Sequence, residues 1–285
     1  MPSRGMLETR KLVNGLRLNT VCVEARCPNL TECWSRGTAT FMILGDQCTR
    51  RCHFCAVSTR KPLPPEPDEP ERLAEAAAQL KLRHVVITSV ARDDLPDEGA
   101  AHFARCIEAT RAQLPTATVE VLVPDFHARR AWIELVCAAG PDVYNHNLET
   151  VARLQKRVRP AARYRRSLDV LRIARAVGPA TMKTKSGLMV GLGETHAELA
   201  EAMRDLRAAH CDLLTIGQYL RPGPNQVPVE RYYPPAEFDA LADEARGLGF
   251  EGVASGPFVR SSYFAETLYA GVETGHLDTG HDAAT

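Results

Sequence analysis

The feature that most constrains the fold is a regular alternation between β-rich apolar runs and segments with helical periodicity, beginning near residue 40. The runs predicted as strands are Thr40–Gly45, His84–Val90, Thr118–Val123, Val143–Asn147, Thr181–Val190 and Leu213–Leu220. The segments predicted as helices are Glu69–Leu82, Ala100–Leu114, Ala128–Ala139, Tyr164–Val177, His196–Ala209 and Pro235–Leu248. Strands that alternate with helices form right-handed βαβ units around a parallel sheet. Six such units are fewer than the eight of a closed barrel, so we expect an α/β fold, an open partial (β/α)6 barrel.

The composition is that of a globular protein without a charge bias. Among 285 residues, 45% are apolar and 25% charged, and 35 basic residues balance 35 acidic ones. This balance offers no support for nucleic-acid binding, and no apolar run is long enough to span a membrane. The opening stretch MPSRGMLETRKLVNG lacks the apolar core of a secretory signal. We therefore expect a cytoplasmic protein, in which clustered cysteines favour metal binding over disulfides.

Six of the nine cysteines fall between residues 22 and 55, in two triplets of different spacing. The C-x4-C-x5-C triplet is Cys22, Cys27 and Cys33, and the C-x3-C-x2-C triplet is Cys48, Cys52 and Cys55. Thiolates are soft ligands that suit iron–sulfur clusters, zinc and copper. Because a structural cage is normally closed by four protein ligands, a triplet leaves one position for another ligand.

The second triplet directly follows the first predicted strand, at its carboxyl end. Active sites of parallel α/β barrels are assembled at this end of the strands. Three thiolates would hold three irons of a [4Fe–4S] cluster and leave the fourth iron free. A zinc site is the alternative, but it needs a fourth ligand, and His53 is poorly placed for that role between two of the cysteines.

The C-x3-C-x2-C spacing resembles the signature of the radical S-adenosylmethionine superfamily, in which the free iron is chelated by the methionine moiety of the cofactor. Phe54 matches the aromatic position of that signature, whose backbone contacts the adenine. The resemblance implies a partial (β/α)6 barrel, in agreement with the strand count. It also implies reductive cleavage of the cofactor to a 5′-deoxyadenosyl radical, which abstracts hydrogen from an unactivated carbon.

A glycine-rich strand end lies further along the chain, in the stretch GLMVGLGE. Gly187, Gly191 and Glu194 resemble the superfamily pattern G-x-I-x-G-x-x-E, with Met189 in the isoleucine place. Glycines permit close approach of the backbone to a flat adenine. A tight turn before a helix is the alternative for this stretch, and the cysteine triplet upstream favours the cofactor site.

The presence of the first triplet narrows the resemblance to the lipoyl synthase family. Further matching stretches are TSVARDDL (Thr88–Leu95), VYNHNLETV (Val143–Val151), KTKSGLMVGLGE (Lys183–Glu194), GQYLRP (Gly217–Pro222) and RSSYFA (Arg260–Ala265). The resemblance thus covers the chain from about residue 20 to residue 265, and it places Thr88 and Lys183 among the cofactor contacts. It implies that the first triplet holds an auxiliary [4Fe–4S] cluster whose fourth ligand is a serine, Ser262, with Ser261 as the fallback.

The reaction implied by this resemblance is the insertion of two sulfur atoms, at C6 and C8, into an octanoyl chain on a lysine of a carrier protein. The auxiliary cluster is dismantled as the sulfur donor, and two molecules of S-adenosylmethionine are cleaved. The implied partners are an octanoylated carrier (the glycine cleavage H protein or an E2 subunit), an electron donor and proteins that repair the cluster. Neither a nucleic acid nor a membrane is expected as a partner.

Polar residues at other strand ends are further candidates. Arg92 and Asp93, with Asp94, follow the second strand and could bind the cofactor; an arginine–aspartate pair capping the next helix is the alternative. So many polar side chains at the fourth strand's end would be costly if buried unpaired, so we expect them to line the site. These are Asn145, His146, Asn147 and Glu149. Gln218 and Tyr219 end the sixth strand and are candidate cofactor contacts, with core packing the alternative for Tyr219.

A basic stretch stands out in this neutral chain. It comprises Arg153, Lys156, Arg157, Arg159, Arg163, Arg165 and Arg166. A solvated helix face is the usual meaning of such a run, and a docking surface for an acidic carrier is the functional alternative. We expect three parts of the chain: an extension with the first triplet (1–38), the partial barrel (39–250) and a second extension with the RSSY motif (251–285).

Two other functions compete with sulfur insertion into an acyl chain. A methylthiotransferase would share the two-cluster chemistry, but such enzymes usually carry an RNA-binding domain, for which neither length nor charge leaves room. A non-catalytic zinc or iron–sulfur scaffold would not need the glycine–glutamate strand end or the polar residues at the barrel mouth.

Overall fold

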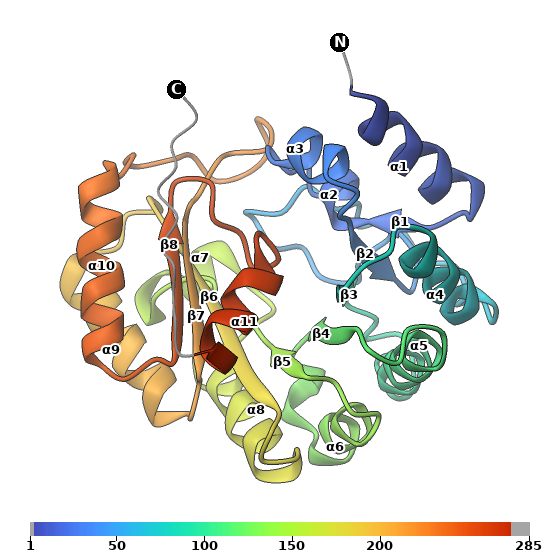
Figure 1. Ribbon diagram of the computed structural model, residues 1–285. Helices are drawn as coiled ribbons and strands as arrows, with labels where there is room; N and C mark the ends of the chain where they lie inside the picture. Colours follow the sequence, from blue (N-terminus) through green and yellow to red (C-terminus); the bar gives the residue numbers. More distant parts are fainter. Residues whose placement is uncertain (1–2, 275–285) are drawn as a thin grey trace.

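The computed structural model describes residues 3–274 of the chain as a curved sheet wrapped by helices (Figure 1). The strands are β1 (Asn19–Thr20), β2 (Thr40–Ile43), β3 (His84–Ser89), β4 (Thr118–Leu122), β5 (Val143–Asn145), β6 (Lys183–Val190), β7 (Leu213–Gln218) and β8 (Gly252–Gly256). They pair in sequence order, β1 antiparallel to β2 and all later neighbours parallel. The sheet has unpaired edges at β1 and β8, so the barrel is open.

Helices cover the outer face of the sheet in the order expected for βαβ units. The α-helices before β5 are α1 (Arg4–Gly15), α2 (Val21–Glu24), α3 (Leu30–Ser35), α4 (Glu69–Gln79), α5 (Ala100–Gln113) and α6 (Arg130–Ala138). Those after it are α7 (Gln155–Val158), α8 (Tyr164–Val177), α9 (His196–Ala208), α10 (Pro235–Gly247) and α11 (Ala265–Thr274), and short 3-10 turns lie at η1 (Phe126–Ala128) and η2 (Ala152–Leu154). None of these helices combines the length and apolarity needed to cross a membrane.

The expected partial barrel is confirmed, with one addition. All six predicted strands are present as β2 to β7, and β8 joins the sheet as a seventh parallel strand. The sequence GVASG of β8 has one branched side chain and two glycines, which is a weak strand pattern. Its strand conformation is supported by the parallel pairing with β7. Residues 275–285, the end of the expected second extension, lie outside the described residues.

Two apolar layers hold the helices against the sheet. One lies between β2–β5 and the helices α4, α5, α6 and α8, and the other surrounds β6 and β7 under α9 and α10. The strands are almost entirely buried, as in other parallel sheets that are covered by helices. At its start α9 has a capping box, in which Thr195 and Glu198 bind each other's backbone N–H groups.

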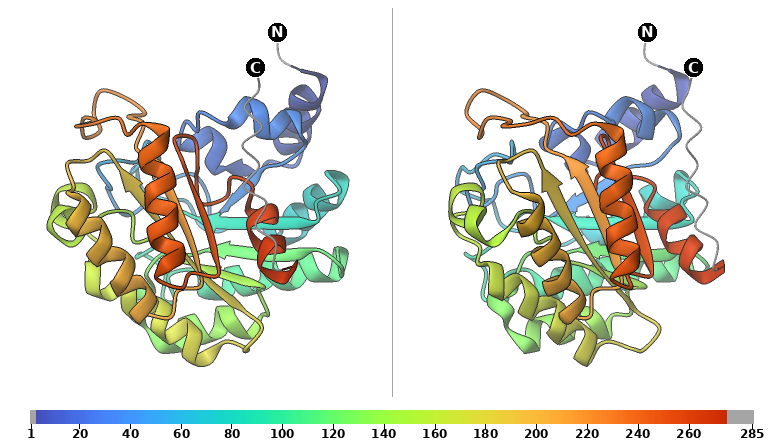
Figure 2. Two further views of the ribbon diagram at one scale, coloured as in Figure 1. Left: turned by 60° about the vertical axis from the view of Figure 1, so that its left-hand side comes forward. Right: turned by 90° about the vertical axis from the view of Figure 1, so that its left-hand side faces the viewer.

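The inner face of the sheet is closed from two sides (Figure 2). The segment with α2 and α3 lies over the end of the sheet at which the parallel strands finish. Near the other end, α11 contacts β3 and β8 and so lies across the open side of the barrel. Leu268 and Val272 of α11 pack with Val143 and Leu213 in a small apolar cluster. These two covers border the space inside the barrel.

Candidate active site

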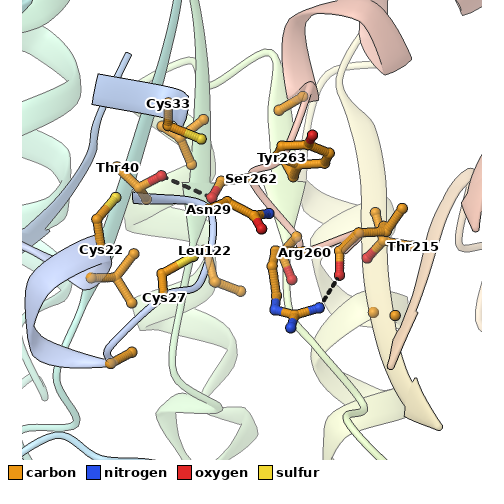
Figure 3. A pocket seen from close by; sticks show the side chains of 18 of the residues that line it. Cys22, Cys27, Asn29, Cys33, Thr40, Leu122, Thr215, Arg260, Ser262 and Tyr263 are labelled. Carbon is orange, nitrogen blue, oxygen red and sulfur yellow. Dashed lines mark hydrogen bonds between the residues drawn. The ribbon is translucent and has the colours of Figure 1, made fainter. Parts of the chain in front are cut away.

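A cavity of about 510 Å³ lies inside the barrel and extends from the carboxyl ends of the strands to His84 at the start of β3 and to Glu266 of α11. Its walls include all three cysteines of the first triplet and, from the second, Cys55. The RSSY segment borders the same space, as Figure 3 shows for Arg260, Ser262 and Tyr263 facing Cys22, Cys27 and Cys33. Residues that are far apart in the sequence therefore meet in one cavity.

The first triplet is assembled by two short helices that flank a turn. Cys22 lies in α2 and Cys33 in α3, while Cys27 lies between them. Burial, reinforced by the neighbouring thiols of Cys22 and Cys27, raises the pKa of Cys33 to about 12. None of the three thiols forms a disulfide. Burial thus favours the protonated thiol at Cys33, and a bound metal cluster would have to displace that proton.

The RSSY segment is tied onto the first triplet by side-chain contacts. Asn29 donates a 2.7 Å hydrogen bond to the carbonyl of Phe258, and the Tyr263 hydroxyl lies 3.0 Å from a Glu32 carboxylate oxygen. Thr40, at the start of β2, donates from its hydroxyl to the Ser262 hydroxyl at 2.8 Å. These contacts hold Ser262 on the side of the cavity that carries the triplet.

The neighbouring serine points the other way. The Ser261 hydroxyl accepts a 2.6 Å hydrogen bond from the side-chain amide of Asn147, just beyond β5. The same amide donates to Glu149, whose pKa is raised by burial. The two serines that the sequence left as alternatives therefore lie against opposite walls.

The second triplet lies in a loop after β2 whose backbone amides point at its sulfur atoms. Cys48 Sγ accepts from the N–H groups of Arg50 and Ala91 at 3.4 and 3.3 Å, and Cys55 Sγ accepts from Val57 at 3.5 Å. Such amides stabilise a thiolate or a cluster-bound sulfur. Burial raises the pKa of Cys55 to about 12, and the nearby thiols of Cys52 and Cys48 contribute to the increase.

An arginine within this loop fixes it to the barrel. Arg50 donates to both carboxylate oxygens of Asp93 and, at 2.8 Å, to Asp125. Its side chain is only 9% exposed. Burial would raise the pKa of Asp93, yet the hydrogen bond from Arg50 lowers it overall. The carboxyl ends of β3 and β4 thereby hold the loop that carries the second triplet.

The cavity wall opposite the first triplet carries several of the predicted cofactor contacts. Those that line the cavity are Phe54, Asn147, Glu149, Gly187, Met189, Gln218 and Tyr219. The Oδ1 atom of Asn147 is buried without a hydrogen-bond partner, so it is an acceptor available to a ligand. A side chain at position 187 would come within 2.9 Å of that same atom, so only glycine leaves it accessible.

Three predicted contacts bind protein groups instead. Arg92 donates to both oxygens of Asp94 and to the Leu44 carbonyl, and Asp93 binds Arg50. Neither arginine–aspartate pair caps the next helix, because α5 starts only at Ala100. Thr88 donates to the Leu122 carbonyl within the sheet. Protein partners thus occupy the polar groups of Thr88, Arg92 and Asp93, and none of the three lines the cavity. Their contact with the cofactor stays a prediction.

Lys183 and Asn145, which were also predicted to contact the cofactor, do not line the cavity. Lys183 is the first residue of β6 and pairs with Glu251 at 2.6 Å, at the strand end remote from the cavity. Asn145 is fully buried and donates to Glu120. The lining residues Gly187 and Asn147 come further along the same two chain segments. The contact of Lys183 and Asn145 with the cofactor stays a prediction.

Gly191 and Glu194 shape the turn after β6 and do not face the cavity. Both carboxylate oxygens of Glu194 accept backbone N–H groups, from Gly191 at 2.6 Å and from Leu192 at 2.9 Å. Gly191 has a φ of +96°, and a side chain there would collide with Gln218 and the Arg231 carbonyl. The glutamate thus stabilises the turn, and its contact with the cofactor stays a prediction.

His146 has no free nitrogen for a ligand. Its ring nitrogens lie 2.9 Å from the Val123 carbonyl oxygen and 3.0 Å from the Ser167 hydroxyl. Burial lowers its pKa to about 4. His53 Nδ1 lies 2.7 Å from the Arg157 carbonyl oxygen.

Sequence reasoning missed four residues that shape the site. Arg50 could have been noticed from its place between two cysteines. Arg260 could have been noticed from its place in RSSY, where its half-buried guanidinium lies near Cys27 and Glu149. Thr40 has no local signal, because its role depends on Ser262, 222 residues away. Gln226 donates to the Cys55 carbonyl at 3.1 Å from a loop to which no contact had been assigned.

The comparisons with known proteins agree with this geometry. Residues 42–206 match the model of the Radical SAM superfamily. Two solved structures share the fold. The FeFe-hydrogenase maturase HydG from Carboxydothermus hydrogenoformans has a TM-score of 0.54 and 14% identity, with 83% of this chain and 66% of that chain covered. Streptococcus suis SuiB bound to S-adenosylmethionine has a TM-score of 0.56 and 14% identity, with 84% of this chain and 56% of that chain covered. The chain thus spans between half and two thirds of the length of these two structures.

Curated relatives are similar over almost the whole chain. A lipoyl synthase from Methylococcus capsulatus is 58% identical over 258 residues, which cover 90% of this chain and 80% of the relative. A lipoyl synthase from Nitratidesulfovibrio vulgaris is 54% identical over 94% of this chain and 89% of its own. The chain therefore belongs to the lipoyl synthase family of the radical SAM superfamily.

Proposed function

We propose that this chain makes the lipoyl group by inserting sulfur at C6 and C8 of an octanoyl chain that is bound to a lysine of a carrier protein. The observation that carries this proposal is the single cavity bordered by both cysteine triplets. An acyl chain in that cavity would have a sulfur source on one side and a hydrogen-abstracting cofactor on the other.

Cys48, Cys52 and Cys55 would hold the [4Fe–4S] cluster that binds S-adenosylmethionine. The three thiols are free of disulfides, and backbone amides already point at two of them. Three thiolates hold three irons of such a cluster, which would leave the fourth iron for the cofactor. Arg50 would keep this cluster at a fixed place relative to the barrel.

The cofactor would lie along Phe54, Asn147, Glu149, Gly187, Met189, Gln218 and Tyr219, the lining residues opposite the first triplet. The free Oδ1 of Asn147 and the buried carboxylate of Glu149 are acceptors that suit the amino and hydroxyl groups of S-adenosylmethionine. Gly187 permits the close approach that the acceptor at Asn147 requires.

Cys22, Cys27 and Cys33 would hold the auxiliary [4Fe–4S] cluster, with Ser262 as its fourth ligand. The hydrogen bond from Thr40 keeps the Ser262 hydroxyl beside the triplet, whereas Asn147 keeps Ser261 on the opposite wall. A serine oxygen is a harder ligand than thiolate and suits iron in a cluster less well. We therefore propose Ser262 over Ser261, at the corner where the cluster would open first.

When bound, the cofactor and the two clusters supply the radical that removes hydrogen and the sulfur that replaces it. The chain's own residues orient the reactants and exclude water. The cavity walls would surround the acyl chain, and the segment 258–263 is held against the cavity by its bonds to Asn29, Glu32 and Thr40. Exclusion of water protects a reactive carbon centre from side reactions.

The partners that we propose are an octanoylated carrier (the glycine cleavage H protein or an E2 subunit), an electron donor and proteins that rebuild the auxiliary cluster. We propose the cytoplasm as the compartment, because free clustered thiols persist where glutathione and thioredoxin keep them reduced.

The basic stretch offers a smaller docking surface for the carrier than the sequence indicated. Four of its seven arginines and lysines bind protein groups: Arg153, Arg157, Arg159 and Arg166. Lys156, Arg163 and Arg165 are exposed, and no ion pair is found for them within residues 3–274. We propose that these three cations steer an acidic carrier toward the cavity.

Charge reversal tests the docking proposal. Arg163→Glu combined with Arg165→Glu should slow the reaction on the intact carrier about 10-fold at low salt and leave a short octanoyl-lysine peptide unaffected. A matched control reverses Arg105, an arginine of α5 remote from this stretch. Equal losses on carrier and peptide would contradict the docking role.

Anaerobic reconstitution tests the function itself. The protein should take up about eight irons per chain, as two [4Fe–4S] clusters require. With reductant, S-adenosylmethionine and octanoylated carrier, the carrier mass should change by two sulfurs replacing two hydrogens. Unmodified carrier with abundant deoxyadenosine would refute the substrate, and tightly bound zinc without iron would refute the cluster chemistry as well.

A further inference from the structure

A buried tryptophan beside the first triplet carries a polar group without a partner. Trp34 lies in α3, next to Cys33 in the sequence, and is only 1% exposed. Its indole Nε1 is buried, and no group within residues 3–274 accepts a hydrogen bond from it. Most buried N–H groups have an acceptor, because leaving a buried donor unpaired is unfavourable. This donor therefore needs an acceptor close by, and the first triplet offers one.

The apolar cluster that holds Trp34 includes a cysteine of the first triplet. Trp34 packs there with Cys22, Met6 and Ala39. Helix α1 packs against α3, and the hydroxyl of Thr9 in α1 donates to the Trp34 carbonyl at 3.0 Å. The indole ring is thus held in a fixed place beside the Cys22 side chain.

Two N–H groups face the Cys22 sulfur. Burial raises the pKa of the Cys22 thiol, and the backbone N–H of Thr40 and the indole N–H of Trp34 act in the opposite direction. Both groups are therefore close enough to stabilise negative charge on this sulfur. Figure 3 shows Cys22 beside Thr40, whose hydroxyl binds Ser262. A neutral thiol is a weak acceptor, which is why the indole forms no regular hydrogen bond with it.

A bound cluster would make this sulfur a stronger acceptor. A cysteine sulfur on iron carries negative charge, and hydrogen bonds to charged acceptors are roughly twice as strong as those between neutral groups. Hydrogen bonds to the sulfur atoms are among the features that set the reduction potential of an iron–sulfur cluster. Because reduction adds negative charge, a donor at Cys22 stabilises the reduced cluster more than the oxidised one.

We propose that Trp34 is a positioning residue for the auxiliary cluster, whose indole N–H donates to the Cys22 sulfur and raises the reduction potential of that cluster. The inference rests on the proposed function, because it takes Cys22, Cys27 and Cys33 as the cluster's ligands. It adds a residue that adjusts how readily this cluster accepts an electron. Trp34→Phe isolates the effect, since phenylalanine fills most of the same space without the donor.

The first test measures reduction potentials in the full-length protein with both clusters. An anaerobic redox titration is followed by electron paramagnetic resonance, and the signal that changes on addition of S-adenosylmethionine belongs to the cluster of the second triplet. Trp34→Phe should lower the equilibrium constant for reduction of the auxiliary cluster about 10-fold, which is about 59 mV for one electron. The other cluster should keep its potential. An unchanged auxiliary potential, or an equal shift of both clusters, would overturn the proposal.

The chain offers a matched control, because it has two tryptophans. The second, Trp132, lies in α6 on the outer side of the sheet, with the guanidinium carbon of Arg129 5.4 Å from its ring centroid. Trp132→Phe should leave both potentials unchanged. A shift in Trp132→Phe equal to that in Trp34→Phe would refute the role of the indole at Cys22.

A spectroscopic test decides the question even if Trp34→Phe does not fold. Trp132→Phe leaves Trp34 as the single indole, and ultraviolet resonance Raman spectroscopy then reports whether its N–H is hydrogen-bonded. The indole band should move to the position of a hydrogen-bonded N–H when the clusters are assembled. A band that stays at the position of a free N–H in the cluster-loaded protein would overturn the proposal.

Failure of the proposed function has a different signature. A protein that holds both clusters and shows the expected change at Trp34, yet leaves an octanoyl peptide unmodified, would refute sulfur insertion and support the role of Trp34. A protein that converts the peptide while the Trp34 band does not move would refute the role of Trp34 alone.

Discussion

A single methyl group on β7 should separate sulfur insertion from cofactor cleavage. Gly217 lies against the backbone just before the RSSY motif, and a Cβ atom there would come within 2.1 Å of the Val259 carbonyl oxygen. Ordinary contacts begin near 3.4 Å, so in Gly217→Ala the backbone at Val259 must retreat by about 1.3 Å. Because the blocking atom belongs to the backbone, no side-chain rotation can relieve the clash.

The consequence of this shift can be worked out from the contact at Ser262. A movement of this size, carried along three residues, would lengthen the 2.8 Å bond between Thr40 and Ser262 beyond hydrogen-bond distance. Overpacking of this kind costs about 1–3 kcal/mol. A displacement of ~1 Å in a reacting group lowers a rate by about 100-fold. We expect Gly217→Ala to form lipoyl product about 100-fold more slowly while it still cleaves S-adenosylmethionine at a rate within about 3-fold of normal.

The assay measures lipoylated peptide by mass spectrometry and deoxyadenosine by chromatography in the same anaerobic reaction. Gly256→Ala is the matched control, because its Cβ would meet only the Val259 side chain, at 3.4 Å. A normal rate of product formation by Gly217→Ala would show that β7 does not hold the RSSY segment in place. An equal loss in Gly256→Ala would show that the backbone clash is not the cause.

Three further predictions concern single side chains. Ser262→Ala should abolish lipoyl product and alter the electron paramagnetic resonance signal of the auxiliary cluster, whereas Ser261→Ala should change neither; the reverse pattern would exchange their roles. Arg50→Gln breaks a buried ion pair and should destabilise the protein by about 3–5 kcal/mol in urea denaturation. It should also lower the iron content below about eight per chain. A normal stability and a normal iron content would refute the role of Arg50 in holding the loop of the second triplet. Burial lowers the pKa of His146 from 6.5 to about 4. Between these two values the imidazole is protonated in the unfolded state and neutral in the folded state. Stability should therefore fall by about 2 kcal/mol more between pH 7 and pH 5 in the unmodified protein than in His146→Asn, and equal slopes would refute this origin.

The main elements of the fold follow from local sequence. Tyr164–Val177 was predicted as a helix and is α8 with the same bounds, because its apolar residues recur with helical spacing. By contrast, β8 was not predicted, since glycine and serine carry little strand preference. It exists because β7 provides a partner, and pairing between strands is a property of the whole sheet.

Residue spacing alone determined that the chain carries two thiol triplets and a glycine-rich strand end, since these are matters of residue type and order. The tertiary structure decided which polar residues are free to act. Asn145 and Lys183 looked equivalent to Asn147 and Gly187 in the sequence, yet two to four positions along a strand move a side chain out of the cavity. Ser261 and Ser262 differ by one position, and opposite walls hold them through bonds to residues 114 and 222 positions away. Contacts over such distances depend on how the sheet curves and closes, and no local pattern records them.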